Sequence, residues 1–243
     1  MKTANNQNPL EQFWIENIFS AARETGHTYQ PEQGQWRASQ LPYCGRKLML
    51  QKQPAWIPDI EVSEEDSLAL GSNTIGQAIH EFVQNLIGDK CVAIEPHIVL
   101  KIDNYSIEGH IDLLINLGQL TIVDIKTFHR SEKYDIERYL PNPHHIEQLS
   151  IYCSITNLWN AQLLYIERNT FEPLFYELEE EVLRESAARM QDKVINLTML
   201  EEQQILPERL PKKWDKYNGY EKLDWQCGYC QFKNYCFGSE ETE

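Results

Sequence analysis

Asp112, Asp124 and Lys126 have the types and the spacing that metal-assisted cleavage of a phosphodiester requires. Residues 105–116 and 120–127 alternate as two strands of a predicted hairpin, in which Asp112 faces Asp124. Because side chains alternate along a strand, Lys126 shares the face of Asp124. Two opposed carboxylates repel each other, and a bound Mg²⁺ or similar cation would explain the pair, with Lys126 orienting or deprotonating a water. The alternative is a lysine that merely neutralises two surface acids.

Four cysteines predict a second centre. Cys44 stands alone near the start, whereas Cys227, Cys230 and Cys236 are close together near the end. Four thiolates with a CxxC step suit either zinc or an iron-sulfur cluster, and the spacing alone does not choose between them. In a reducing compartment they are metal ligands rather than disulfides. Such a centre would tie the two ends of the chain together.

Composition limits the class of protein. The chain has 243 residues, is 42% hydrophobic and carries a net charge of −15, which suits a globular protein but opposes binding to a polyanion. Two local segments depart from this acidic average and could contact a polyanion. Residues 36–53 hold four basic residues and no acids, and residues 212–222 mix lysines with aromatic residues; both flank the cysteines. No apolar stretch is long enough to span a bilayer, so a soluble, unexported protein is expected.

The remaining elements are predicted from periodicity and from breaker residues. Helices are expected at 9–23, 39–51, 73–87 and 142–159, and along the apolar stripe 183–197. Strands are expected at 92–102, 105–116 and 120–127, as an antiparallel meander, and at 163–167 and 173–178. On the predicted hairpin, the residues that point away from the carboxylates into a core are Ile111, Leu113, Val123 and Ile125. A main domain is expected at 1–206, with Cys44 contributed to a cysteine segment at 207–243.

Several of these motifs together resemble the PD-(D/E)XK nuclease superfamily. The run from Gly109 to Asp112, followed by Asp124 to Thr127, is similar to its two central motifs. Residues 76–80 resemble the GxxxH motif of the RecB-like branch, and residues 148–152 resemble its QxxxY motif. The arrangement of one cysteine before this core and three after it is similar to the iron-sulfur subset of that branch, above all to the CRISPR-associated Cas four exonuclease family.

The resemblance implies a fold, a site and cofactors. The fold would be α/β, a PD-(D/E)XK restriction-endonuclease-like core of mixed sheet flanked by helices, with a small cysteine-ligated iron-sulfur lobe formed by both termini. Mn²⁺ or Mg²⁺ would be held by His80, Asp112 and Asp124, with Lys126, Asp112 and Asp124 catalytic and with Gln148 and Tyr152 binding substrate. A [4Fe-4S] cluster would be held by Cys44, Cys227, Cys230 and Cys236.

The resemblance also implies a biological role. It predicts a metal-dependent, single-stranded DNA exonuclease, with endonuclease activity as a secondary property, that processes DNA ends for CRISPR spacer acquisition beside CRISPR integrase proteins. A phage or repair nuclease that acts with a helicase or recombinase is one alternative. A catalytically silent iron-sulfur binding module is another. The expected location is the cytoplasm of a prokaryote, or of the host for a phage-encoded protein, without a membrane partner.

Overall fold

The computed structural model describes residues 32–53, 64–87, 90–116, 118–130, 136–215 and 219–238, without the side chains of 64–74 and 136–137. The helix predicted at 9–23 lies outside these residues. The strands are β1 (Gln35–Arg37), β2 (Cys91–Ile94), β3 (His97–Ile102), β4 (Tyr105–His110), β5 (Leu113–Asn116), β6 (Leu120–Phe128), β7 (Ala161–Glu167), β8 (Pro173–Glu177), β9 (Lys213–Asp215) and β10 (Tyr220–Lys222). The helices are α3 (Gly45–Lys52), α4 (Glu64–Ile87), the 3₁₀ helix η4 (Ile136–Tyr139), α5 (Pro143–Thr156), α6 (Glu180–Glu202), α7 (Trp225–Gly228) and α8 (Lys233–Phe237).

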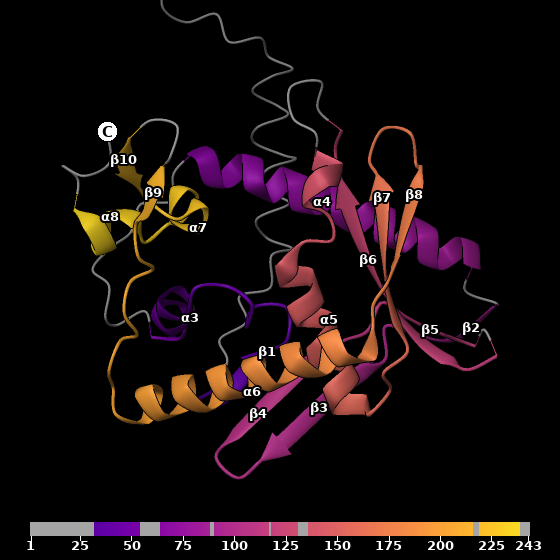
Figure 1. Cartoon of the computed structure of the whole chain (residues 1–243), viewed down its shortest axis with the longest axis horizontal. Coiled ribbons are helices and arrows are strands. Elements are labelled where there is room, and N and C mark those ends of the chain that lie inside the picture. Colours follow the sequence, from indigo (N-terminus) through magenta and orange to yellow (C-terminus); the bar gives the residue numbers. More distant parts are fainter. Residues whose placement is uncertain are drawn as a thin grey trace, which may run out of the picture.

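A mixed five-stranded sheet, β2-β5-β6-β7-β8, forms the centre of the molecule (Figure 1). Its β6 and β7 are parallel and its other neighbours are antiparallel. A three-stranded sheet, β1-β4-β3, continues from it, and β9 with β10 forms a small hairpin near the three C-terminal cysteines. Helices flank the sheets, which confirms the predicted mixed α/β class. None of the described helices has the length and apolar character needed to cross a membrane.

The predicted three-strand meander is wrong in one respect, because two of its strands bend and divide between the two sheets. The first breaks into β2 and β3 at Glu95, which has a positive φ of 47° and precedes Pro96. The second breaks into β4 and β5 opposite that point, where Glu95 N donates to Asp112 O (3.2 Å) and Ile111 N donates to Pro96 O (3.2 Å). Both strands therefore bend together, at the level of Asp112.

The hairpin register was predicted correctly, since Leu113 pairs with Val123 and Asn116 with Leu120. Leu113, Val123 and Ile125 pack with Ile79 of α4 in one apolar cluster, as expected. Ile111 is a correction. It belongs to the other, larger cluster, on the side of α5 and α6, because the bend interrupts the alternation of side chains.

Helices α5 and α6 lie near their predicted positions, whereas α3 and α4 begin elsewhere. Helix α4 starts nine residues before the predicted start at 73, because the sequence Gly71-Ser72-Asn73 does not interrupt it. Helix α3 starts later than predicted, after a turn at 38–43. Helix α5 begins as expected, with the Asn142 side chain accepting from His144 N and Pro143 in the first turn, and it ends at Asn157 with a left-handed φ of 56°.

The described N-terminal segment is fixed to α6 by a buried ion pair. Lys52 Nζ lies 2.7 Å from Glu201 Oε1, and it also donates to Gln35 O (3.0 Å). Gly34 N donates to Glu201 Oε2 (2.9 Å), so the carboxylate is bound on both sides. The Lys52 ammonium also lies 4.0 Å from the Trp36 ring centroid. These contacts fix the orientation of α3, whose first residue follows Cys44.

The turn between β7 and β8 is organised by one buried carboxylate, Glu167, which is 1% exposed. It accepts from Arg130 N (3.1 Å), Asn169 N (2.8 Å) and both the N (2.7 Å) and the Oγ1 (3.0 Å) of Thr170. Burial alone would raise the pKa of Glu167, but these donated hydrogen bonds lower it to about 2.

Replacing Glu167 with Gln should remove a pH-dependent part of the stability. The folded pKa of about 2 lies below the ordinary value of 4.5, so ionised Glu167 stabilises the fold above that value and its contribution declines as the pH falls toward 2. Chemical denaturation at several pH values should show a difference in unfolding free energy between wild type and Glu167→Gln that is largest near neutrality. Glu185→Gln, on the exposed face of α6, is the control. A difference that stays constant with pH would contradict this.

Candidate active site and cysteine cluster

Asp112 lies where the two sheets separate, between β4 and β5. Its Oδ2 accepts a hydrogen bond from Ile125 N (2.6 Å). In a continuous ladder that amide of β6 would donate to a backbone carbonyl of the neighbouring strand, but the bend has removed that partner. The Asp112 carboxylate takes the place of the missing carbonyl and is thereby fixed beside β6.

Asp124 and Lys126 occupy the face of β6 that looks toward α5. Asp124 is fully buried, and its Oδ2 lies 2.7 Å from Lys126 Nζ. Apart from this ion pair, Asp124 Oδ2 has no hydrogen-bond partner among the described residues. A buried carboxylate beside a second acid is costly when one ammonium must balance both, so this atom is suited to receive a cation.

The electrostatics of the pair follow from burial and mutual proximity. Burial raises the pKa of Asp124, the Asp112 charge adds to this and Lys126 opposes it, giving a pKa of about 6. Burial would lower the pKa of Lys126, but Asp124 and Asp112 outweigh it and raise that pKa above its ordinary value. Burial is also the largest cause that raises the pKa of Asp112. Two buried acids and one ammonium thus share a site that has an excess of negative charge when all three are ionised.

Helix α4 brings His80 to the same place. His80 Nδ1 lies 3.6 Å from Asp112 Oδ2. Burial, followed by the charge of Lys126, lowers the pKa of His80, so the imidazole is neutral near pH 7, the form that binds metal ions. At Gly76, one turn earlier, an added Cβ would lie 3.4 Å from Thr127 Oγ1, an ordinary van der Waals contact, so α4 lies against β6 at this point.

Glu95 is a site residue that the sequence analysis missed. Its backbone donates to Asp112 O, and its Oε1 accepts from Gln84 Nε2 (3.2 Å). Its charge adds to the burial effect that raises the pKa of Asp112. The available signal was the pair Glu95-Pro96 inside an otherwise extended run, which marks a break in the strand.

Gln148 and Tyr152 lie one turn apart on α5, as their spacing predicts. Gln148 Nε2 lies 2.7 Å from the Tyr152 hydroxyl and 3.4 Å from Asp124 Oδ1. Tyr152 is only 2% exposed and packs against Gly109, where an added Cβ would come within 2.7 Å of the ring. The structure therefore brings Gln148 to the carboxylates and keeps Tyr152 behind it.

The four cysteines predicted to form one centre line a single cavity together. Cys44 directly precedes α3, Cys227 is in α7, Cys230 follows α7 and Cys236 is in α8. The Gln226 side chain accepts from Cys44 N (2.9 Å), which joins the two ends of the chain. Burial, followed by the nearby thiols Cys44 and Cys230, raises the pKa of Cys227 to about 11. Mutual repulsion of this kind would be relieved by a shared metal.

The donor types at both centres suit metals, but their spacing is not that of a formed site. Across the part of the chain that the structure describes, no group of three or more His, Cys, Asp or Glu side chains is placed so as to hold a metal ion. At the carboxylates, Lys126 lies against the Asp124 oxygen that a metal would use. At the cysteines, the thiols face one cavity of about 20 Å³.

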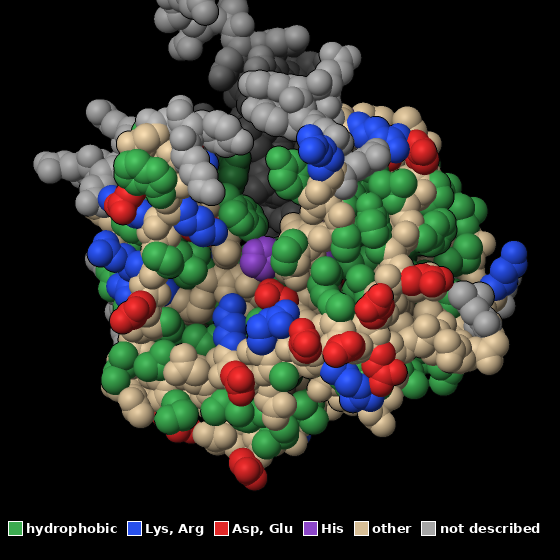
Figure 2. All heavy atoms as spheres, in the orientation of Figure 1, with side chains coloured by type: hydrophobic (Ala, Val, Ile, Leu, Met, Phe, Trp, Pro, Cys, Tyr) green, Lys and Arg blue, Asp and Glu red, His purple; other side chains and the backbone are tan. Residues whose placement is uncertain are grey.

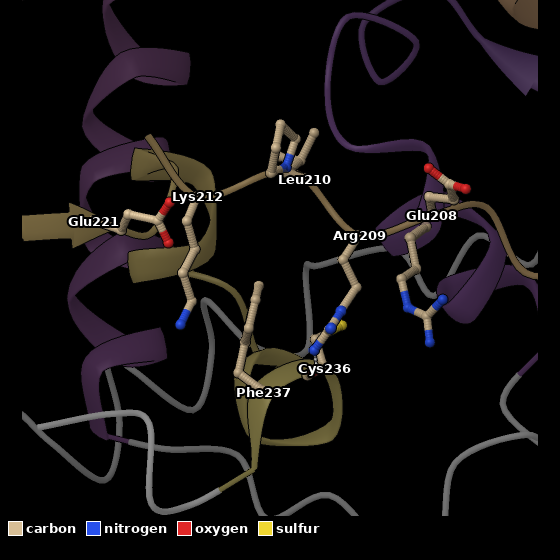
Figure 3. A pocket seen from close by; sticks show the side chains of 9 residues that line it. Glu208, Arg209, Leu210, Lys212, Glu221, Cys236 and Phe237 are labelled. Carbon is tan, nitrogen blue, oxygen red and sulfur yellow. Dashed lines mark hydrogen bonds between the residues drawn. The ribbon is translucent and has the colours of Figure 1, made fainter. Parts of the chain in front are cut away.

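A basic groove of about 890 Å³ runs beside the cysteine cavity (Figure 3). Arg46, Arg209 and Lys212 line it together with Glu208, Glu221 and Phe237. Arg209 donates to Cys236 O (2.6 Å), and its guanidinium lies 5.1 Å from the Phe237 ring centroid. Arg46 comes from the first basic segment of the sequence and Lys212 from the second, so the fold brings both segments together as expected.

Comparison with known structures supports the fold. The protein in the structure called "Crystal structure of SSO0001" is 20% identical, with a TM-score of 0.59, covering 92% of this chain and 96% of that one. An alkaline exonuclease from Laribacter hongkongensis, LHK-Exo, is 13% identical with a TM-score of 0.44, covering 78% and 95%; this likeness is too low to carry an argument.

Sequence comparison identifies the family. Among curated proteins, none matches this chain. The model of the PD-(D/E)XK nuclease superfamily matches residues 76–237, a span that holds His80, Asp112, Asp124, Lys126, Gln148 and the three C-terminal cysteines. This match covers about two thirds of the sequence, and the chain therefore belongs to the PD-(D/E)XK nuclease superfamily.

Proposed function

We propose that this protein is a metal-dependent DNA nuclease with its active centre at Asp112, Asp124, Lys126 and His80. The observation that carries the proposal is the fully buried Asp124 carboxylate, which lies beside a second acid and has the ammonium of Lys126 as its counter-charge. A surplus of buried negative charge is expensive unless a cation uses it. Members of this superfamily typically use divalent metals such as Mg²⁺ or Mn²⁺.

Each residue has a distinct part in the proposed reaction. His80, Asp112 and Asp124 would hold Mn²⁺ or Mg²⁺, which supplies a more acidic water and stabilises charge on the phosphate. Lys126 contacts Asp124 Oδ2 at 2.7 Å, so its ammonium must leave that oxygen when a cation arrives. Its side chain is then free to donate to the attacking water or to a phosphate oxygen. Gln148 contacts substrate, and buried Tyr152 positions Gln148.

The substrate proposed is DNA with single-stranded ends, cut as an exonuclease with secondary endonuclease activity. The basic groove of Arg46, Arg209 and Lys212 supports a polyanionic ligand in spite of the net charge of −15. The resemblance to the RecB-like Cas four family supports a role in CRISPR spacer acquisition with integrase partners in a prokaryotic cytoplasm. The neighbouring genes would distinguish this from a phage or repair nuclease.

The proposal includes an iron-sulfur cluster on Cys44, Cys227, Cys230 and Cys236, within a lobe formed by residues 207–243 and the Cys44 segment, beside a nuclease domain at 1–206. The four thiols around one cavity support a shared metal, as do the contacts that join both ends of the chain there. Closing so long a loop stabilises the folded chain by restricting the unfolded one. Zinc is the competing occupant.

Asp112→Asn should lower the rate of metal-dependent DNA cleavage by at least about a hundredfold, a typical effect of removing one charged group that stabilises a transition state. The asparagine keeps an oxygen that can accept from Ile125 N, so the bend should survive and the melting temperature should change little. The measurement is digestion of end-labelled single-stranded DNA with and without Mn²⁺.

The matched control is Asp192→Asn, which changes an exposed aspartate of α6 that is not one of the site residues. It should cleave like wild type. Full activity in folded Asp112→Asn protein would contradict the assignment, as would wild-type cleavage that persists in chelator.

Protein purified without oxygen should show a broad brown visible band and contain iron, and Cys227→Ser should lose both and melt at a lower temperature. Cys91→Ser is the control, because Cys91 lies on β2, where its thiol is 3.5 Å from Ile87 O, and it lines no part of the cysteine cavity. Colourless protein that contains zinc, and loses it in Cys227→Ser, would replace the cluster by a zinc site. Protein without metal and unchanged by the substitution would contradict a metal centre altogether.

A further inference from the structure

Three aromatic side chains from separate parts of the chain form a row beside the active site, with one stacked and one tilted pair. The rings of Tyr43 and His144 are 5.0 Å apart between centroids and inclined by only 28°. His144 in turn lies 5.6 Å from Trp225, inclined by 51°. The outer member, Trp225, is 53% exposed. A large aromatic side chain that is half exposed at the end of such a row has a free face for another ring.

Contacts in all three segments hold the row in place, and the His144 ring itself lies with Nδ1 3.3 Å from Glu147 Oε2. Lys193 Nζ donates to Tyr43 O (2.6 Å), which fixes Tyr43 to α6. The Gln226 side chain accepts from Cys44 N, so the segments carrying Tyr43 and Trp225 are bound to each other. His144 N donates to the Asn142 side chain at the start of α5. Pre-organisation of this kind lowers the entropic cost of binding a ligand.

The row is connected to the catalytic centre through α5. His144 and Gln148 are four residues apart, so they lie on one face of the helix about one turn, or about 5.4 Å, from each other. Gln148 reaches Asp124 Oδ1. His145, the residue after His144, has its Nδ1 2.7 Å from the Tyr165 hydroxyl. Tyr165 of β7 is in turn the strand partner of Lys126 on β6. The row therefore begins on the same face of α5 as Gln148, the residue that contacts the Asp124 carboxylate.

The surface around this region is hollowed. Figure 2 shows a histidine side chain in a hollow of the surface. The hollow lies between the part of the molecule that carries β9, β10, α7 and α8 and the part that carries the two larger sheets, with lysine or arginine side chains beside it. The chain as a whole repels a polyanion, since its net charge is −15. Contacts that do not depend on charge are therefore needed to retain a strand there, and stacking of bases on aromatic rings is such a contact, at about 1–3 kcal/mol per base.

We propose that Tyr43, His144 and Trp225 form a stacking platform for an unpaired base of single-stranded DNA that enters the active site. This inference rests on the proposed function and names how the site selects its substrate. Inside a duplex both faces of every base pair are already stacked, so the platform takes only unpaired bases. Tyr43 precedes Cys44 and Trp225 lies two residues before Cys227, so the cysteine lobe supplies two of the three rings.

The test measures the binding of an end-labelled oligothymidylate to the full chain without divalent metal, with fluorescence anisotropy as the readout. Trp225→Ala and His144→Ala should each weaken binding by about 5- to 100-fold, the range that 1–3 kcal/mol corresponds to. The loss should persist at high salt, because stacking is not ionic. Tyr43→Phe, which keeps the ring, should bind like wild type. Binding of a blunt DNA duplex should be the same in all variants.

The matched control is Phe175→Ala, which removes another exposed aromatic side chain, 64% exposed on β8 and outside both the row and the basic groove. It should leave binding unchanged. Thermal melting and metal content of Trp225→Ala should equal those of wild type, which separates lost stacking from a damaged cysteine lobe. If they fall, His144→Ala, which changes no residue of that lobe, decides the test, provided that its own metal content equals that of wild type.

Two results would overturn the platform: oligothymidylate binding that is unchanged in both Trp225→Ala and His144→Ala, or duplex binding that falls as much as single-strand binding. The outcome for the proposed function is separate. If wild type cleaves DNA but Trp225→Ala and His144→Ala bind normally, the nuclease stands and the platform fails. If wild type cleaves nothing while binding still depends on both residues, the platform stands and the nuclease fails.

Discussion

The hydrogen bond from Ile125 N to the Asp112 carboxylate is the contact on which the rest of the structure depends. It forms because two neighbouring strands bend at the same level, at Glu95 and at Ile111–Asp112. The bend lets β5 stay beside β6 while β4 leaves to pair with β1 and β3. A side chain thus completes a backbone ladder, and an acid is fixed at the opening between two sheets, where α4 adds His80 and α5 adds Gln148.

Burial then gives this opening its chemical character. Asp124 is fully enclosed between β6 and α5, and Lys126 is the counter-charge that makes its burial tolerable. The arrangement is a compromise, since one ammonium cannot neutralise two neighbouring acids when both are ionised. A site under this strain favours any cation that can replace the ammonium. The neutral state of His80 follows from the same burial and from the charge of Lys126.

Much of this could be predicted from the sequence where one regular pattern controls the structure. The pairing of Leu113 with Val123, the buried stripe of α6 and the start of α5 at Pro143 follow from alternation, helical period and capping. The bend could not be predicted, because a positive φ at Glu95 depends on contacts across two strands. Ile111 was assigned to the wrong cluster, and Glu95 was missed, for that reason. The stack of Tyr43, His144 and Trp225 joins three distant segments, which no local pattern reveals.

The central claim is that His80, Asp112 and Asp124 bind a divalent cation in competition with Lys126. Electron paramagnetic resonance of Mn²⁺ titrated into the full chain tests it most directly, because free and bound Mn²⁺ give different signals without any need for substrate. The account predicts one Mn²⁺ bound per chain in wild type and none, or far weaker binding, in Asp124→Asn of unchanged fold. Folded wild-type protein that binds no Mn²⁺, or equal binding by the variant, would contradict it.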